Sequence, residues 1–116
     1  MTIEKFLQKF PDASFYDGIT EGILTRKICA MILHLYLQKV LHEKDEIGIE
    51  KAYFIKDLFD CRVCANHIAQ ICLKGIMQPC KLAEDLFLFH LEKEIDEEES
   101  ELYLIRANNI ENRLKV

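Results

Sequence analysis

The feature that most constrains this chain is a stretch with helical spacing, residues 19–42, that is apolar almost all the way round. A helix that is apolar on every side belongs in the interior of a domain. At about 1.5 Å per residue, such a helix is about 36 Å long. The whole chain holds four glycines and two prolines, so few residues interrupt regular structure. We therefore predict a long central helix that organises the fold.

Shorter segments with helical character flank the central one. Thr2 is placed to cap a first helix that Pro11 ends, and a regular helical pattern starts near Ile49. Two further helices are predicted, one from Pro79 and one after the acidic residues that precede Leu102. The sequence thus predicts an all-α fold, a small bundle of four to five helices around a long central helix, in a single helical domain over residues 1–116.

One alternative concerns residues 86–106. The run LFLFHL alternates well enough to form a strand, and it could pair with LYLIR across an acidic turn. The intervening glutamates favour the start of a helix instead. An α+β fold with a C-terminal β-hairpin from residues 86–106 is kept as the alternative to the all-α bundle.

Charge and cysteine usage bound the function classes. The net charge is −5, and residues 92–101 hold seven acids and one lysine, so the acidity is local and no basic patch suits a nucleic acid. No apolar run approaches the roughly 20 residues that span a bilayer, so we expect a soluble protein with no membrane partner. The five cysteines are an odd number and the first residues lack a secretory pattern. Reduced thiols and a cytoplasmic location are therefore expected.

The helical pattern after residue 49 contains an unusually regular apolar seam. Its members follow alternating steps of four and three residues, the 3.5-residue repeat of one helix that packs along another. We interpret the seam as a surface for a protein partner or for self-association, with a homodimer as the simplest form. The seam residues are Phe54, Leu58, Cys61, Ala65, Ile68 and Cys72.

The segment DCRVCANHIAQIC contains the residue types best suited to metal binding or catalysis. Cys61, Cys64 and His67 are ligand types for zinc, which makes a metal site one alternative. In a continuous helix, steps of three leave His67 about 120° from Cys61 around the axis, so the main expectation is no metal and no cofactor. Cys64 and His67 also share a stripe with Asp60, as a nucleophile, a base and an orienting acid would. This candidate thiol site is not accompanied by any known enzyme signature.

The sequence therefore predicts a non-enzymatic helical module for protein interaction or self-association. The alternative is a metal-binding or redox-active thiol protein that uses Cys61, Cys64 and His67. Among the other polar residues, His34 is assigned to a solvated stripe of the central helix, and Arg106 and Arg113 to the solvated surface. Cys29, in the most apolar segment, is expected to be an inert core thiol.

Overall fold

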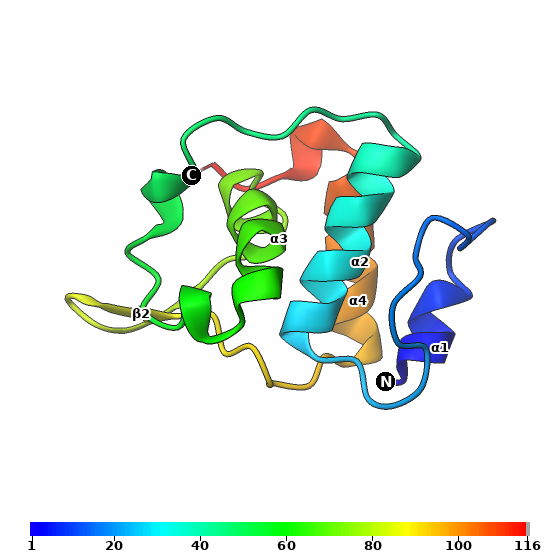
Figure 1. The fold of residues 1–116 in the computed structure, drawn as a ribbon, viewed down its shortest axis with the longest axis horizontal. Helices are drawn as coiled ribbons and strands as arrows, with labels where there is room; N and C mark the ends of the chain where they lie inside the picture. The colour runs from blue at the N-terminus through cyan, green and yellow to red at the C-terminus, as the bar shows by residue number, and fades with distance from the viewer. Residues whose placement is uncertain (116) are drawn as a thin grey trace.

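Helix α2 (Arg26–Lys39) lies between the other helices and contacts both α3 (Arg62–Leu73) and α4 (Glu97–Asn108). Figure 1 shows α2 in cyan in the middle, the short α1 (Ile3–Leu7) on one side, and α3 with a β-hairpin on the other. This computed structural model describes residues 1–115. The hairpin pairs β1 (Cys80–Ala83) with β2 (Leu86–Leu88) in antiparallel register. Within the described residues there are also three short 3₁₀ helices: η1 (Ile49–Ala52), η2 (Leu58–Asp60) and η3 (Ile110–Asn112).

The predicted all-α bundle is wrong, and the α+β alternative fits the fold class. The hairpin differs from the predicted one, however, because LFL pairs with the residues before it and not with LYLIR. LYLIR lies inside α4, as the preference for a helix there required. Asp96 caps this helix: its side chain accepts the backbone N–H of Glu99 at 2.8 Å, and the side chain of Glu99 accepts the N–H of Asp96. Glu97, Glu98 and Glu99 of the acidic stretch therefore form the first turn of α4.

The helix predicted from Pro79 is replaced by the hairpin and an extended segment, because the start of α2 supplies hydrogen-bond partners. The backbone N–H groups of Arg26 and Lys27 donate to Lys93 and Leu91, and Ile95 donates to the carbonyl of Leu24. An extended backbone has its N–H and C=O groups free for such distant partners, whereas a helix uses them internally. These bonds hold residues 89–95 along the first turn of α2.

The buried guanidinium of Arg26 joins three parts of the fold. It is 5% exposed, lies over the ring of Phe89 and donates to the carbonyl of Phe89 at 2.7 Å. It also donates to the carbonyl of Gln78 at 2.7 Å and to the hydroxyl of Tyr103 on α4 at 3.2 Å. Arg26 thus satisfies polar groups on both sides of the hairpin and on α4 at once.

The long helix expected after residue 49 begins only at Arg62. Before it, the carboxylate of Asp57 accepts the backbone N–H groups of Phe89 and His90, at 2.7 and 2.9 Å, and Lys56 donates its N–H to the carbonyl of Phe87. These contacts tie residues 56–57 to the end of the hairpin and hold them outside a helix. The regular seam therefore crosses two different structures, turns up to residue 61 and a helix after it.

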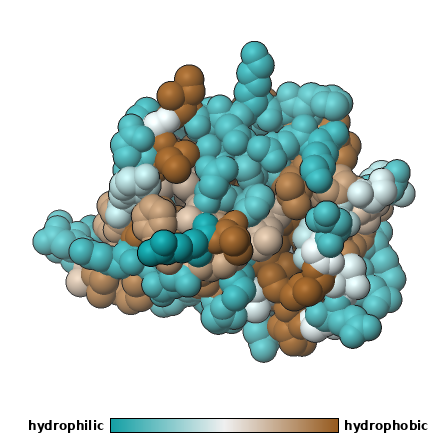
Figure 2. Space-filling view, in the orientation of Figure 1, coloured by the Kyte–Doolittle hydropathy of each residue, from teal (hydrophilic) through white to brown (hydrophobic). Residues whose placement is uncertain are grey.

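The seam residues lie mostly in the core of the chain itself. Four of them, Leu58, Ala65, Ile68 and Cys72, are at most 6% exposed, and Phe54 is 48% exposed and packs edge-on against Phe87. The face in Figure 2 is largely hydrophilic, with apolar residues scattered over it. Because α2 already covers the helical part of the seam, that part is not a free docking stripe. Within residues 1–115, no helix combines the length and apolar character needed to cross a bilayer.

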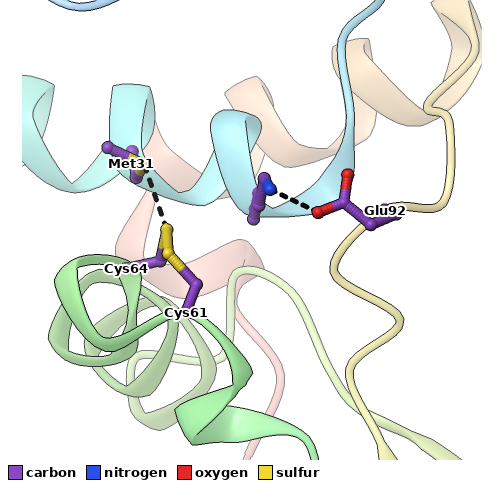
Figure 3. The surroundings of a disulfide bond; sticks show 5 residues. Met31, Cys61, Cys64 and Glu92 are labelled. Atoms are coloured by element: carbon purple, nitrogen blue, oxygen red, sulfur yellow. Dashed lines mark hydrogen bonds and ion pairs between the residues drawn. A yellow bond between two sulfur atoms is a disulfide. The ribbon is translucent and has the colours of Figure 1, made fainter.

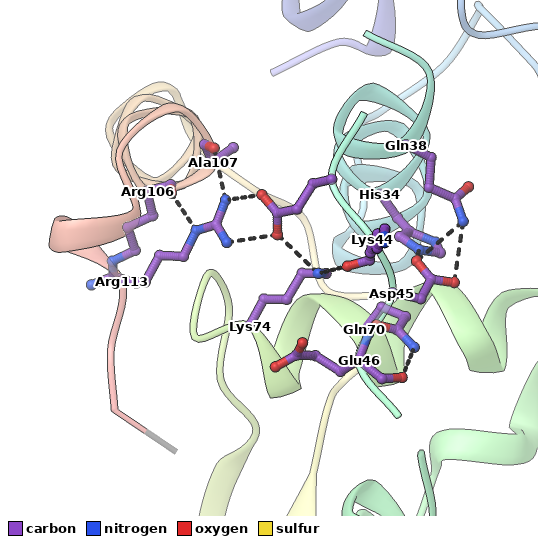
Figure 4. A network of polar contacts seen from close by, with 11 residues as sticks. His34, Gln38, Lys44, Asp45, Glu46, Gln70, Lys74, Arg106, Ala107 and Arg113 are labelled. Atoms are coloured by element: carbon purple, nitrogen blue, oxygen red, sulfur yellow. Dashed lines mark hydrogen bonds and ion pairs between the residues drawn. The ribbon is translucent and has the colours of Figure 1, made fainter. Parts of the chain in front are cut away.

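A charged cluster fastens the C-terminal segment to the loop after α2 (Figure 4). Arg113 donates two hydrogen bonds to the carboxylate of Glu43, at 2.7 and 2.8 Å, and the ammonium of Lys74 lies 2.8 Å from the same carboxylate. Arg106 donates to the carbonyl of Ile76. The assignment of both arginines to the solvated surface is therefore wrong, since each one anchors the chain.

Acid is expected to weaken this cluster. Hydrogen bonds from Arg113, then from Lys74, hold the pKa of Glu43 below its ordinary value of 4.5. A lowered folded-state pKa contributes stability above pH 4.5 that is lost as the pH falls through the folded-state value. We expect the urea midpoint of the wild type to fall more steeply below pH 4.5 than that of Glu43→Gln. Glu46→Gln, which leaves these ion pairs in place, should follow the wild type; equal curves for all three proteins would contradict the assignment.

Candidate functional site

Cys61 and Cys64 form a disulfide at the start of α3 (Figure 3). Cys61 is the N-cap residue with extended backbone angles, and Cys64 lies in the first turn of the helix. The expectation of reduced thiols is therefore wrong for this pair. The predicted exclusion of a metal site at Cys61, Cys64 and His67 also assumed that Cys61 was helical. Because the helix begins after Cys61, its side chain can turn back toward Cys64.

The two sulfurs of the disulfide differ in their access to solvent. Cys64 is 3% exposed, and its sulfur lies 3.7 Å from the sulfur of Met31 on α2. Cys61 is half-buried and lines an open cavity of about 740 Å³. A reagent in this cavity therefore meets Cys61 first, while Cys64 is covered by α2.

The cavity at Cys61 has a mixed polar lining. Lys27, whose ammonium pairs with Glu92, and Lys93 lie on the same cavity as the half-exposed thiol of Cys80. Asp57 also lines it, but its carboxylate oxygens accept the backbone bonds described above. Asp60 and Glu92 line the cavity as well, so charges of both signs lie beside the disulfide.

A chain of three polar side chains begins one turn further along α3. Nδ1 of His67 lies 2.8 Å from Nδ1 of His34 on α2, and Nε2 of His34 lies 2.7 Å from a carboxylate oxygen of Asp45. His34 is 1% exposed and His67 is half-buried. Burial, and next the neighbouring His34, lower the pKa of His67 from its ordinary value of 6.5. His67 is therefore a neutral base at pH 7.

In the candidate thiol site, His67 therefore has a different partner from the predicted Asp60. Asp60 is exposed at the end of η2, and His67 is hydrogen-bonded to His34 instead. The assignment of His34 to a solvated stripe is wrong, because the loop after α2 folds back and covers it. The sequence did contain a signal, since a histidine that interrupts an apolar helix needs partners when buried.

The structure gives the zinc alternative no ligand set. Among residues 1–115, no group of three or more His, Cys, Asp and Glu side chains is placed to hold a metal ion. Cys61 and Cys64 are bonded to each other, and Nδ1 of His67 faces His34. Each of the three expected ligands therefore has another partner.

The remaining cysteines separate into two buried thiols and one accessible thiol. Burial raises the pKa of Cys29 far above its ordinary value and that of Cys72 to about 12, so both stay protonated at neutral pH. Cys80 is the third free cysteine and is half-exposed. The expectation that Cys29 is an inert core thiol agrees with its burial.

Comparison with known proteins gives one likeness of fold. No protein family and no curated protein matches the sequence. Among solved structures, the undecahaem cytochrome from the S-layer of Carboxydothermus ferrireducens matches with a TM-score of 0.67 at 13% sequence identity. The match covers 91% of this chain and 16% of that one. The chain therefore shares its fold with a small part of a multihaem cytochrome.

Proposed function

We propose that the chain is a redox-active protein whose Cys61–Cys64 pair carries out thiol–disulfide exchange with a partner dithiol or disulfide. The observation that carries this proposal is the closed pair at the start of α3, with one sulfur open to a cavity and the other buried under α2. A C-X-X-C pair with an accessible first cysteine is the arrangement in which thiol–disulfide exchange is commonly found. The interaction-module prediction is not carried forward, because the helical part of its seam lies in the core and the matched solved structure is a cytochrome.

The position at the helix start supports exchange at Cys61. The first backbone N–H groups of a helix and its dipole favour a negative charge there, which stabilises the thiolate that must leave or attack. α3 has 12 residues, long enough for a developed dipole. The thiolate of Cys61 is therefore the better leaving group and the better nucleophile of the pair.

The disulfide closes too short a loop to serve mainly as a staple. In the chain-entropy relation, a loop of about four residues contributes about 2 kcal/mol to the free energy of unfolding, against about 4.7 kcal/mol for a loop of 100 residues. Arg26 on α2 and Asp57 before α3 both bond to the backbone of Phe89, so these segments are joined without the disulfide. The pair is thus free to open without loss of the fold.

The exchange step is a two-electron transfer with a dithiol. One thiolate of the dithiol attacks the sulfur of Cys61, the Cys61–Cys64 bond breaks, and Cys64 leaves with the electron pair and takes up a proton. The second thiol of the dithiol then attacks the mixed disulfide and releases the Cys61 thiolate. The dithiol becomes a disulfide, and the two cysteines become reduced. The reverse sequence reduces a partner disulfide.

The likeness to a cytochrome is in keeping with redox chemistry, but this chain does not provide a haem site of the covalent type. Attachment of haem c needs C-X-X-C-H, and Ala65 stands where that histidine is required. Both ring nitrogens of His34 are hydrogen-bonded, so His34 has no nitrogen free for an iron atom. No step is therefore assigned to haem. The neighbour is described as coming from an S-layer, and the cytoplasmic location of this chain stays a prediction.

Differential alkylation tests the proposal. The protein is equilibrated in glutathione buffers of graded potential, and each cysteine is quantified by mass spectrometry. We expect reversible opening of Cys61–Cys64 in the folded protein, with reduced Cys61 alkylated roughly 10-fold faster than Cys80, and with Cys29 and Cys72 unreacted. The reduced protein should stay folded, with a loss of at most about 2 kcal/mol.

Two cysteine variants serve as a matched pair. Cys61→Ser should abolish exchange, whereas Cys80→Ser, which removes a thiol from the same cavity, should keep it. A disulfide that opens only when the protein unfolds would be a structural crosslink, and this outcome would contradict the proposed function. Equal alkylation of Cys61 and Cys80 would remove the special reactivity of Cys61.

A further inference from the structure

We propose that Asp45, His34 and His67 form a relay in which His67 takes the proton of Cys64 when the disulfide closes and, in the reverse step, passes a proton from solvent to Cys64. This inference rests on the proposed thiol–disulfide exchange and assigns a role to the polar chain beside it. The relay residues come from three places in the sequence: the loop after α2, α2 itself and α3.

The relay and the disulfide occupy successive steps of one interface. The sulfur atoms of Met31 and Cys64 meet at 3.7 Å, and three residues later on both helices His34 meets His67 at 2.8 Å. Positions three apart on a helix have Cβ atoms about 5–6 Å apart. One water molecule can span such a separation while His67 keeps its hydrogen bond to His34.

Cys64 needs a proton acceptor because its surroundings do not stabilise a negative charge. Cys64 is 3% exposed, and its sulfur faces a thioether, which offers no donor to a thiolate. An unpaired buried charge is costly, so the Cys64 thiol must lose its proton as it attacks and regain one as it leaves. His67 is the basic side chain one turn away on the same helix.

The hydrogen bonds assign the tautomers of the two histidines. A carboxylate only accepts hydrogen bonds, so Nε2 of His34 carries the hydrogen that is donated to Asp45. Nδ1 of a neutral His34 is then an acceptor, and Nδ1 of His67 must donate to it. Nε2 of His67 is thereby left with its lone pair free. The chain fixes His67 in the form that can accept a proton at Nε2.

The charge of Asp45 supports His67 when it becomes protonated. An imidazolium at His67 donates through Nδ1 to His34, which donates in turn to the carboxylate, so the positive charge is paired through the neutral ring. Burial and His34 keep the pKa of His67 below 6.5, and the charge of Asp45 raises it in part. His67 is thus neutral before the step and stabilised after it, as a general base requires.

The loop that carries Asp45 is held in place by three contacts (Figure 4). Nε2 of Gln38 donates to both carboxylate oxygens of Asp45, at 3.1 and 3.2 Å. The buried side chain of Gln70 pairs with the backbone N–H and carbonyl of Glu46, and the ammonium of Lys74 donates to the carbonyl of Lys44. The carboxylate is therefore fixed opposite His34 before any reaction.

Closure of the disulfide can be followed in full-length reduced protein that carries Cys80→Ser. The aromatic disulfide 5,5′-dithiobis(2-nitrobenzoate) releases one chromophoric thiolate when Cys61 attacks it and a second when Cys64 displaces the Cys61 adduct. We expect His67→Gln to leave the first phase within about twofold and to slow the second about 10²-fold at pH 7. Asp45→Asn, which changes an exposed side chain, should slow the second phase about tenfold.

The pH profile separates a proton acceptor from a packing role. The second phase of His67→Gln should rise with pH and its deficit against the wild type should shrink, because hydroxide replaces the missing base in removing the proton. Asn66→Gln, on the exposed side of the same helix, is the matched control and should follow the wild type at every pH. Equal second phases in the wild type and in folded His67→Gln would overturn the relay alone. A wild type without a second phase would overturn the proposed exchange itself.

Discussion

Replacement of Leu58 by aspartate is expected to unfold the protein and not to dissociate an oligomer. Leu58 is 1% exposed and belongs to the core beneath α3. The change removes a buried side chain, worth about 2 kcal/mol, and places an unpaired carboxylate in the core. We expect the free energy of unfolding to fall by about 4 kcal/mol or more, measured by urea denaturation followed by circular dichroism.

The neighbouring residue supplies the control. Phe59 is 52% exposed and rests edge-on against Tyr53 at the surface. Phe59→Asp should therefore cost only about 1 kcal/mol. A folded Leu58→Asp protein whose mass drops by half in light scattering would show that Leu58 lies in an interface between chains, and it would restore the original interpretation of the seam.

Removal of the buried guanidinium of Arg26 is expected to have the second largest effect. Arg26→Met keeps much of the apolar stem but leaves the carbonyls of Phe89 and Gln78 and the hydroxyl of Tyr103 without their donor. Each buried polar group that loses its partner costs about 1–3 kcal/mol. We expect a loss of about 3 kcal/mol in the free energy of unfolding, together with faster amide exchange at residues 89–95, which Arg26 and its neighbours hold.

Lys27 is the matched control for Arg26. It is the next residue of α2, and its ammonium pairs with the largely exposed carboxylate of Glu92. Exposed ion pairs of this kind contribute about 0–1 kcal/mol, so Lys27→Met should change the urea midpoint little. Similar losses for the two variants would mean that Arg26 acts through general charge and not through its three buried acceptors.

In the candidate site, the sequence could identify residues that lie close together along the chain but not the partners that tertiary packing brings to them. The C-X-X-C pair and His67 could be found in the sequence, because they lie within seven residues of one another. His34 and Asp45 could not be assigned, since their partners depend on how α2 packs against α3 and on where the following loop returns. Sequence spacing pointed to Asp60 as the orienting acid, but the turn at η2 directs that residue to solvent.

The sequence by itself determined the central place of α2, the acidic first turn of the last helix and the presence of a C-X-X-C pair. These features depend on local spacing and on capping residues, which act within one or two turns of the backbone. Only the tertiary structure decided the rest. Asp57 accepts the N–H groups of residues 89 and 90, and Arg26 donates to the carbonyls of residues 78 and 89. Because of these distant bonds, a hairpin replaces the helix predicted from Pro79, and the helix predicted from about Ile49 begins later. The same packing buries His34 against His67, because burial is set by which helices meet and not by the order of residues along one of them.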